Sequence, residues 1–365
     1  MKIHVNRGVE RSFGEALNAW LWPDLFPSLF EDSADGVNFV GIGCILDERL
    51  PARGLNVVLG AGTGHAPSPD VHAAPARWRI YGVRGPLTAR LMDLPESAAL
   101  SDPAVLLARH PRWRQRGASS GGALFVPRAS SAHFGQWPAA CALAGIEFGD
   151  PRGDARTLVD RIARARLVVA ESMHAAVIAD ALRVPWIPVV LSREVAPLTW
   201  TDWAATVGVE YLPLLLAPSS PLEQLRARVL SHSSLAHIGP YRDQARRNGG
   251  PRELAWTREQ LLGDHAASAA RAAQPWRRRA SVLADGLLQR AAQFAAVPHE
   301  RMAPARYRRL REQAATQLHQ VLASPQRLSP EGAHRRALQR CEDAVGQLQA
   351  DSRAGRFALS TGDRS

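Results

Sequence analysis

The sequence predicts an α/β protein with two doubly wound halves and a helical C-terminal region. Short apolar runs rich in β-branched residues alternate with helical patterns through residues 1–215, which is typical of parallel strands covered by helices. A polar segment at residues 109–122 separates two such series and reads as an interdomain linker. After Leu216 the chain becomes rich in Ala, Arg, Gln and Leu. We therefore expect domains at residues 1–118, 119–235 and 236–365.

Each series contains four runs that we interpret as strands. In the first series they are Ile3–Val5, Val37–Ile42, Asn56–Leu59 and Arg79–Val83. In the second they are Leu124–Val126, Ile146–Phe148, Leu167–Ala170 and Trp186–Val190. Glycine-rich turns follow two strands of the first series, and their backbone N–H groups can approach an anion. This signal is weak alone, because such turns are also common for packing reasons.

The stretch at residues 165–190 places polar side chains where open α/β sheets bind ligands. The apolar strand Leu167–Ala170 is followed by Glu171 and Ser172, and then by a helical pattern with His174 in its first turn. Ligands of such sheets bind outside the carboxyl ends of the strands, near helix N-termini. Glu171, Ser172 and His174 are therefore candidate functional residues.

The net charge of +11 is concentrated in the C-terminal third. Residues 241–365 contain 22 Arg and 12 Asp or Glu, a balance of +10, which leaves +1 for residues 1–240. Lys2 is the only lysine, which excludes a Walker-type phosphate lysine and an internal Schiff-base lysine.

Two apolar stripes at helical spacing run through this basic region. They consist of Tyr307, Leu310, Ala314, Leu318 and Val321, and of Ala337, Leu338, Cys341, Ala344, Val345 and Leu348. These amphipathic helices either pack on the α/β domains with solvated arginines, which is the simpler interpretation, or present a basic face to a membrane or an anionic partner.

The cysteine content is typical of a protein from a reducing compartment. Its three cysteines are scattered and do not form a disulfide framework. The N-terminus lacks the pattern of a signal peptide, and no apolar run approaches the ~20 residues of a membrane span. We expect a cytoplasmic protein. Cys-x-x-Cys, His-Glu-x-x-His and Asp-x-Asp motifs are absent from the sequence, so we expect no metal site.

Six short motifs within residues 1–215 are specific in their combined order and spacing. They are Phe13-Gly14-Glu15-x-Leu17-Asn18, Gly41-Ile42-Gly43, the Gly60–Gly64 loop, Tyr81-Gly82-Val83-Arg84-Gly85-Pro86, Asp102-Pro103-Ala104 and Glu171-Ser172-Met173-His174-Ala175. Together they resemble the polysaccharide pyruvyl transferases, and among these the exopolysaccharide ketal-pyruvate transferases of the succinoglycan type. The C-terminal third lies outside the resemblance.

The resemblance implies transfer of pyruvate from phosphoenolpyruvate to two hydroxyls of a sugar, which forms a cyclic ketal and releases phosphate. Phosphoenolpyruvate would be a co-substrate, and no cofactor is expected. The acceptor would be a sugar or lipid-linked oligosaccharide of an exopolysaccharide repeat unit. The implied fold has two Rossmann-like halves, arranged as in the two-domain (GT-B) glycosyltransferases, with the site between them.

The resemblance and the strand ends together give the candidate site residues. His174 is expected to be the catalytic acid, with Glu171 as base or as orienter of the histidine. Donor binding is assigned to Arg84, Arg128, Arg152, Ser172, Gly62 and Gly64, and acceptor binding to Glu15 and Asn18. Arginine suits a phosphate and a carboxylate through bidentate pairing.

The chain departs from the family pattern at two of these positions. Many members have Asp where this chain has Glu15, and many have Arg where this chain has Ser172. Another arginine must therefore serve the donor phosphate, and Arg84 is the first candidate because it follows a strand and precedes a helix.

Two other functions are compatible with the sequence. A metal-independent two-domain glycosyltransferase using a nucleotide sugar would also lack Asp-x-Asp, and a non-catalytic glycan-binding protein would use the basic tail. Nucleic-acid binding is not expected, because few aromatic residues accompany the basic face. We also expect weak peripheral contact with the anionic inner face of the membrane through six arginines: Arg277, Arg278, Arg279, Arg306, Arg308 and Arg309.

Overall fold

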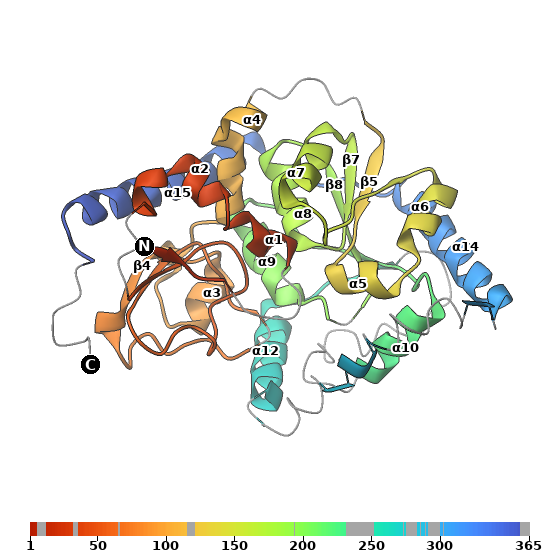
Figure 1. Ribbon diagram of the computed structural model, residues 1–365, viewed down its shortest axis with the longest axis horizontal. Helices are drawn as coiled ribbons and strands as arrows, with labels where there is room; N and C mark the ends of the chain where they lie inside the picture. Colours follow the sequence, from red (N-terminus) through yellow and green to blue (C-terminus); the bar gives the residue numbers. More distant parts are fainter. Residues whose placement is uncertain are drawn as a thin grey trace.

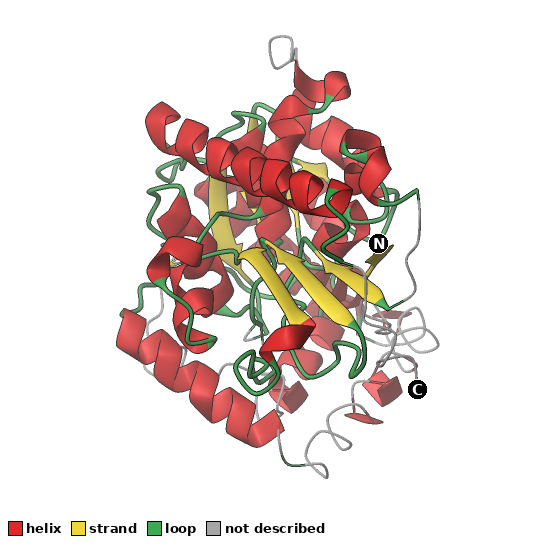
Figure 2. Ribbon diagram, turned by 90° about the vertical axis from the view of Figure 1, so that its left-hand side faces the viewer, coloured by secondary structure: helices red, strands yellow, loops and turns green. Residues whose placement is uncertain are grey.

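The computed structural model describes residues 1–5, 12–31, 36–64, 66–114, 121–192, 194–230, 252–272, 274, 283–284, 286–288, 290, 300–301 and 303–357. Within these ranges the chain forms two mainly parallel β-sheets with helices packed around them (Figures 1 and 2). The predicted α/β class with two Rossmann-like halves is confirmed. The likeness to the two-domain glycosyltransferases stays a prediction.

The N-terminal sheet has four parallel strands whose spatial order follows the chain. They are β1 (Lys2–Ile3), β2 (Val37–Val40), β3 (Leu55–Leu59) and β4 (Trp78–Gly82). The helices of this half are α1 (Phe13–Leu17), α2 (Leu21–Leu25), η1 (Pro27–Leu29), η2 (Pro75–Arg77), α3 (Pro86–Leu91), η3 (Glu96–Ala98), η4 (Pro103–Arg109) and α4 (Pro111–Arg114), the η elements being 3-10 helices. All five residues of β3 are buried, as its apolar run predicts.

The C-terminal sheet has the order β10-β9-β8-β7-β5-β6. Its strands are β5 (Ala123–Val126), β6 (Glu147–Phe148), β7 (Leu167–Ala170), β8 (Trp186–Val190), β9 (Leu214–Leu215) and β10 (Arg252–Glu253). All of its pairs are parallel except β9 with β10. The chain leaves β5 toward β6 and returns on the other side of β5 as β7, so the strand order reverses between β5 and β7. Ligands bind at such a switch point, outside the carboxyl ends of the strands.

The central unit of the C-terminal half agrees closely with the sequence prediction. Strands β7 and β8 have the predicted bounds. The helices of this half are α5 (Ala129–Phe134), α6 (Trp137–Ala144), α7 (Ala155–Arg164), α8 (Met173–Ala181), α9 (Pro197–Thr206) and α10 (Pro221–Leu230). Asp154 caps α7, because its Oδ1 accepts a hydrogen bond from the Thr157 N–H at 2.8 Å.

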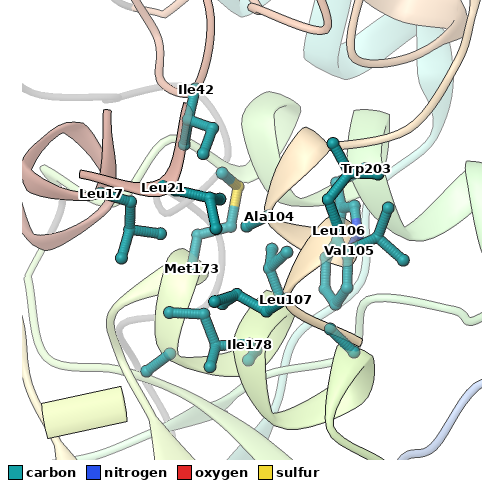
Figure 3. Close-up of a cluster of buried hydrophobic side chains, with 14 of the residues drawn as sticks. Leu17, Leu21, Ile42, Ala104, Val105, Leu106, Leu107, Met173, Ile178 and Trp203 are labelled. Atoms are coloured by element: carbon teal, nitrogen blue, oxygen red, sulfur yellow. The ribbon is translucent and has the colours of Figure 1, made fainter. Parts of the chain in front are cut away.

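One apolar core joins the two halves. Leu17 of α1 and Leu106 of η4 belong to the N-terminal half, and they share a cluster with Met173 and Ile178 of α8 (Figure 3). Both α1 and η4 contact α8 directly. Because apolar side chains of α1 and η4 pack closely against α8, the start of α8 has a fixed position between the halves.

The C-terminal helices pack onto both halves. Helix α12 (Arg258–Ala272) contacts α9, α14 (Pro304–Val321) contacts α6, and α15 (Glu331–Arg353) contacts η4 and β4 (Figure 1). The residues of the two predicted stripes are buried except for Leu310, which is half-buried. The expected packing on the α/β halves is therefore observed, while Arg306, Arg308 and Arg309 are exposed. The predicted boundaries at residues 118/119 and 235/236 lie outside the described residues.

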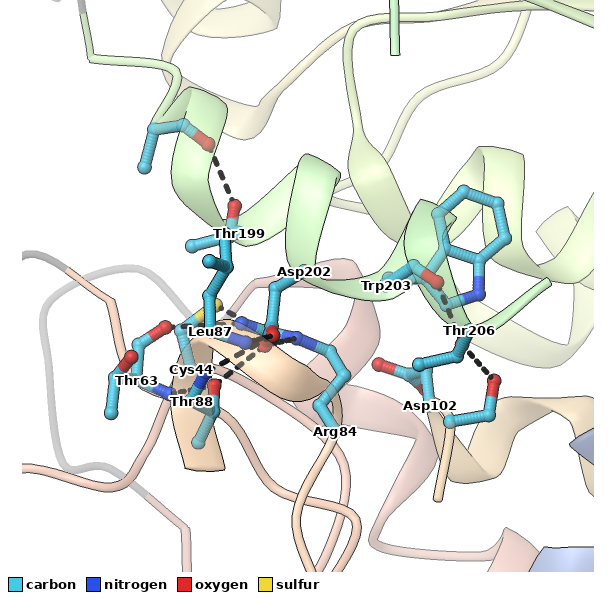
Figure 4. A network of polar contacts seen from close by, with 12 residues as sticks. Cys44, Thr63, Arg84, Leu87, Thr88, Asp102, Thr199, Asp202, Trp203 and Thr206 are labelled. Carbon is cyan, nitrogen blue, oxygen red and sulfur yellow. Dashed lines mark hydrogen bonds and ion pairs between the residues drawn. The ribbon is translucent and has the colours of Figure 1, made fainter. Parts of the chain in front are cut away.

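A buried ion pair connects the halves at the interface of α3 and α9. Asp202 of α9 accepts hydrogen bonds from the backbone N–H groups of Leu87 and Thr88 at 2.8 and 3.1 Å, and from the Thr88 hydroxyl at 2.6 Å (Figure 4). It therefore caps α3 from the other half of the molecule. The Arg84 Nε lies 3.4 Å from the same carboxylate, and both side chains are 0% exposed.

Replacing Asp202 by alanine is expected to lower the free energy of unfolding by about 3–5 kcal/mol, because the Arg84 guanidinium would stay buried without its carboxylate. Urea denaturation followed by tryptophan fluorescence measures this loss. Asp150→Ala is the matched control, since Asp150 forms an ion pair with Arg152 on the surface and should lose about 0–1 kcal/mol. If both variants lost the same free energy of unfolding, the buried ion pair would contribute no more to stability than the surface pair, and the prediction would be wrong.

Candidate active site

A cavity of about 230 Å³ lies between the halves at the switch point of the C-terminal sheet. The N-terminal half lines it with Ser12, Glu15, Cys44 and Arg49, and the C-terminal half with Arg128, Glu171, Ser172, Met173, His174, Val195, Ala196, Thr199 and Trp200. The sequence-predicted residues after β7 therefore meet Glu15 and Arg128 in one place.

The N-terminus of α8 opens onto this cavity. Ser172 is the N-cap residue, but its hydroxyl makes no capping hydrogen bond. The cavity-lining residues Ser172, Met173 and His174 begin the nine-residue helix. Unpaired N–H groups and the positive end of the helix dipole make this position favourable for an anion.

His174 stands between two carboxylates from the N-terminal half. Its Nε2 lies 3.3 Å from Asp102 Oδ2, and the side chain of Asp102 is completely buried. Burial alone would raise the pKa of Asp102, but the charges of His174 and Arg84 hold the pKa of this carboxyl below its ordinary value. On the cavity side, Glu15 also interacts electrostatically with His174. His174 Nδ1 lies against α1, where a Cβ on Gly14 would be 2.0 Å from it.

Glu15 and Glu171 are suited to accept protons. Burial raises the pKa of Glu15, against the opposing charges of His174 and Arg49. Burial also raises the pKa of Glu171, whose Oε2 accepts a hydrogen bond from the Arg128 N–H at 2.9 Å. Glu171 Oε1 has no hydrogen-bond partner among the described residues. Carboxylates with raised pKa values are better bases than ordinary surface carboxylates.

Arg128 provides a positive charge that forms no ion pair within the described part of the chain, although it interacts electrostatically with Glu171 and Glu194. It follows β5 directly, and its guanidinium donates a hydrogen bond to the backbone carbonyl of Glu194. The carboxylate of Glu194 is engaged by Arg226. The charge of Arg128 is thus oriented toward the cavity without an ion-pair partner, and it can bind an anion there.

A second arginine, Arg49, enters the cavity from the N-terminal half. It forms an ion pair with Asp47 at 2.5 Å, and its side chain is 47% exposed. The two arginines approach from opposite halves, so a ligand with two anionic groups can interact with both.

Several sequence-predicted site residues lie outside the cavity. Arg84 does not face it, because the buried pair with Asp202 and hydrogen bonds to Cys44 and the Thr63 carbonyl occupy its guanidinium. Arg152 lies on the surface in an ion pair with Asp150. The donor-binding assignment of these two arginines therefore has no geometric support in this structure.

The glycines and Asn18 assigned to ligand binding have packing contacts. A Cβ on Gly62 would lie 2.3 Å from Arg84 Cζ, and one on Gly64 would lie 2.9 Å from Cys44 Cβ. The completely buried Asn18 accepts hydrogen bonds from Trp22 Nε1 and from the Ile42 N–H, and it donates one to the Ile42 carbonyl. These residues shape the walls behind the cavity.

The sequence did not indicate three residues that the structure brings to the site. Arg49 and Trp200 lie in segments without a motif, and their place depends on how the halves meet. Asp102 does belong to one of the six motifs, in front of Pro103 and Ala104. Its neighbour His174 is 72 positions away along the chain (174 − 102) and on the other sheet's helix, so only the fold reveals the pair.

The fold and the cavity define an α/β protein with a cavity lined by arginine, carboxylate and histidine side chains between two Rossmann-like halves. The family model of the polysaccharide pyruvyl transferases matches residues 41–193. The succinoglycan biosynthesis protein ExoV of Rhizobium meliloti (strain 1021) is 39% identical over 229 residues, which cover 62% of this chain and 71% of that protein. No solved structure matches significantly. The chain belongs to the polysaccharide pyruvyl transferase family and is a transferase enzyme.

Gly14→Ala is expected to displace His174 and to lower kcat almost as much as loss of the imidazole does. A Cβ at this position of α1 would lie 2.0 Å from His174 Nδ1, a distance that no packing tolerates. Gly263→Ala on α12 is the matched control, because a Cβ there meets nothing within 4 Å. Kinetics and thermal unfolding of both variants provide the measurement; full activity of Gly14→Ala would contradict the position of the ring.

Proposed function

We propose that this enzyme transfers pyruvate from phosphoenolpyruvate to two hydroxyls of a sugar in an exopolysaccharide repeat unit, and that it releases phosphate as the ketal forms. The observation that supports the proposal best is the convergence of Arg128, Arg49 and the start of α8 on one cavity that also holds His174. The donor carries a phosphate and a carboxylate, and this cavity offers positive charge from two sides. The similarity to ExoV, a succinoglycan biosynthesis protein, supports an exopolysaccharide as the acceptor.

Donor binding follows from these charges. Arg128 and the N–H groups at the start of α8 bind one anionic group, and Arg49 approaches the other from the N-terminal half. Ser172 stands where many family members have arginine. Its hydroxyl makes no capping hydrogen bond to α8, so it is free to donate a hydrogen bond to phosphoenolpyruvate. Arg128 thus supplies the positive charge that an arginine at the position of Ser172 supplies in many family members.

Proton transfer then uses the groups around His174. The imidazolium donates a proton to the methylene carbon of phosphoenolpyruvate, which becomes a methyl group and leaves a cationic centre at the neighbouring carbon. One sugar hydroxyl attacks that carbon, and a carboxylate, Glu15 or Glu171, removes its proton. Phosphate leaves as its C–O bond breaks, and the second hydroxyl closes the ketal ring. The two sugar hydroxyls lose one proton each. In the overall reaction one of these protons replaces the proton given to the methyl group, and the other is taken up by phosphate.

Phosphate release tests the reaction. The full chain is incubated with phosphoenolpyruvate and with lipid-linked or nucleotide-linked sugars, each alone and in combination. Release that requires both phosphoenolpyruvate and a sugar is the expected result. Consumption of a nucleotide sugar without phosphoenolpyruvate would replace the proposal with glycosyl transfer.

Binding at a membrane surface is part of the proposal, because the acceptor is expected to be lipid-linked. No helix within the described ranges is both long and apolar enough to cross a bilayer. Arg306, Arg308 and Arg309 are exposed on α14, while Arg277, Arg278 and Arg279 lie outside the described residues. Truncation after Ala217 would remove α14 and α15, whose apolar faces are buried, so point substitutions are the better test.

The triple variant Arg306→Gln, Arg308→Gln, Arg309→Gln is expected to bind anionic vesicles roughly 100-fold more weakly, since each basic residue near the surface contributes about 1 kcal/mol. Co-sedimentation with vesicles that contain phosphatidylserine, at low and high salt, measures the loss. Arg335→Gln on α15 serves as the exposed control. Unchanged binding of the triple variant would show that α14 is not the contact face.

A further inference from the structure

We infer that Asp102 is the positioning residue of the catalytic histidine: its buried carboxylate lies 3.3 Å from Nε2 and fixes the imidazole of His174. The inference rests on the proposed function of His174. It deepens that function by assigning a role to a motif residue that does not line the cavity.

The two carboxylate oxygens of Asp102 have different contacts. Its Oδ1 accepts a hydrogen bond from the Ala104 N–H at 3.0 Å and caps η4. Its Oδ2 has no hydrogen-bond partner among the described residues and faces His174 Nε2 at 3.3 Å. One oxygen therefore holds the backbone, and the other is directed at the ring. Among the described residues Nε2 likewise has no hydrogen-bond partner, so the carboxylate and the ring face each other across the two halves.

The carboxylates around the ring differ in their access to the cavity. The titratable groups that face the ring are Asp102, from the start of η4, and Glu15, from α1, while Glu171 lies at the end of β7 beside the same cavity. Glu15 lines the cavity and can take up a proton during the reaction. Asp102 is completely buried, does not line the cavity and has a lowered pKa, so it supplies a permanent charge beside the ring.

The segment that carries Asp102 is held by both halves and by α15. Arg340 of α15 donates hydrogen bonds to the Leu100 carbonyl at 2.7 Å and to the Thr206 carbonyl, at the end of α9, at 3.1 Å. The hydroxyls of Ser101 and Thr206 lie 2.9 Å apart. The residues directly before Asp102 are thus tied to the C-terminal half, which is the half that carries His174. A helix outside the stretch matched by the family model thereby supports the pair.

Asp102→Asn is the decisive variant, because asparagine keeps the shape and the capping oxygen but removes the charge. We expect kcat to fall by up to ~10²-fold, the cost of a misplaced catalytic group, with the KM for phosphoenolpyruvate unchanged. We also expect the loss of kcat at high pH to begin at a lower pH than in the wild type. Asp154→Asn is the matched control, since Asp154 caps α7 in the same way and faces no histidine in the described structure. A purely structural role would lower activity without moving the pH profile, and that result would overturn the inference.

NMR of the histidine ring provides a readout that does not depend on turnover. The ¹⁵N signals of His174 in the full chain are identified by their absence in His174→Ala. In Asp102→Asn they should lose the protonated form at lower pH than in the wild type. If the wild type releases no phosphate but this difference is present, the proposed reaction fails and the pairing stands. If the wild type is active and the signals titrate identically in both proteins, the positioning role is wrong.

A second variant decides the matter if Asp102→Asn does not fold. Arg340→Ala releases the Leu100 carbonyl and leaves Asp102 in place, and it should lower kcat by roughly 10-fold or more with the same change in pH dependence. Glu342→Ala is its control, because it breaks the exposed ion pair between α15 and Arg109 without touching the segment at Asp102. Equal effects of the two substitutions would mean that α15 only stabilises the fold, and would overturn the inference.

Discussion

Replacing His174 by alanine is expected to lower kcat by roughly 10²–10⁴-fold, the usual contribution of a general acid. The imidazole opens α8 at the floor of the cavity, between Asp102 and Glu15. In the described part of the cavity wall no other group combines a proton, a carboxylate partner and a place beside the anion-binding arginines. The measurement is phosphate release under saturating phosphoenolpyruvate and acceptor.

The fold should survive this substitution, which makes the kinetic result interpretable. The apolar core beside His174 is formed by leucines, valines and methionine from both halves, and the substitution leaves these side chains unchanged. His133→Ala is a suitable control, since His133 lies on α5 and does not line the cavity. Turnover near the wild-type rate in a folded His174→Ala protein would show that another group delivers the proton.

Strands β7 and β8 could be predicted to the residue because each is a short, fully apolar run. The runs at β7 and β8 are buried along their whole length, so sequence and structure agree to the residue. At β1 the expected strand Ile3–Val5 is Lys2–Ile3, because an edge strand pairs on one side only and its alternation is weak. The order of the strands required the structure, since pairing between distant segments leaves no local pattern.

The site was predictable where local rules fix it and not where the two halves meet. Glu171, Ser172 and His174 follow a strand and open a helix, and they do line the cavity. Arg84 obeys the same local rule, yet its guanidinium is buried, because Asp202 approaches it from a helix that is distant in sequence. Arg128, which had the weaker sequence argument, lines the cavity instead. Which of two arginines pairs with a carboxylate is decided by tertiary packing.

Arg128→Gln is expected to raise the KM for phosphoenolpyruvate by roughly 10- to 100-fold, because a hydrogen bond to a charged group contributes about 1.5–3 kcal/mol. The guanidinium lies at the end of β5 and donates a hydrogen bond to the Glu194 carbonyl, so glutamine can keep that contact while losing the charge. The effect should fall on donor binding more than on kcat. Initial rates at varied phosphoenolpyruvate, with acceptor in excess, separate the two parameters.

Arg152→Gln is the matched control for this prediction, because Arg152 also follows a strand of the same sheet but lies on the surface beside Asp150. We expect its KM to equal that of the wild type. Arg84→Gln would not serve as a control, since it removes the partner of buried Asp202 and lowers stability. A normal KM in Arg128→Gln, together with a raised KM in Arg152→Gln, would transfer the donor site from the cavity to the surface after β6. A raised KM in Arg128→Gln alone places the donor phosphate or carboxylate at the carboxyl end of β5, where the strand order of the sheet reverses.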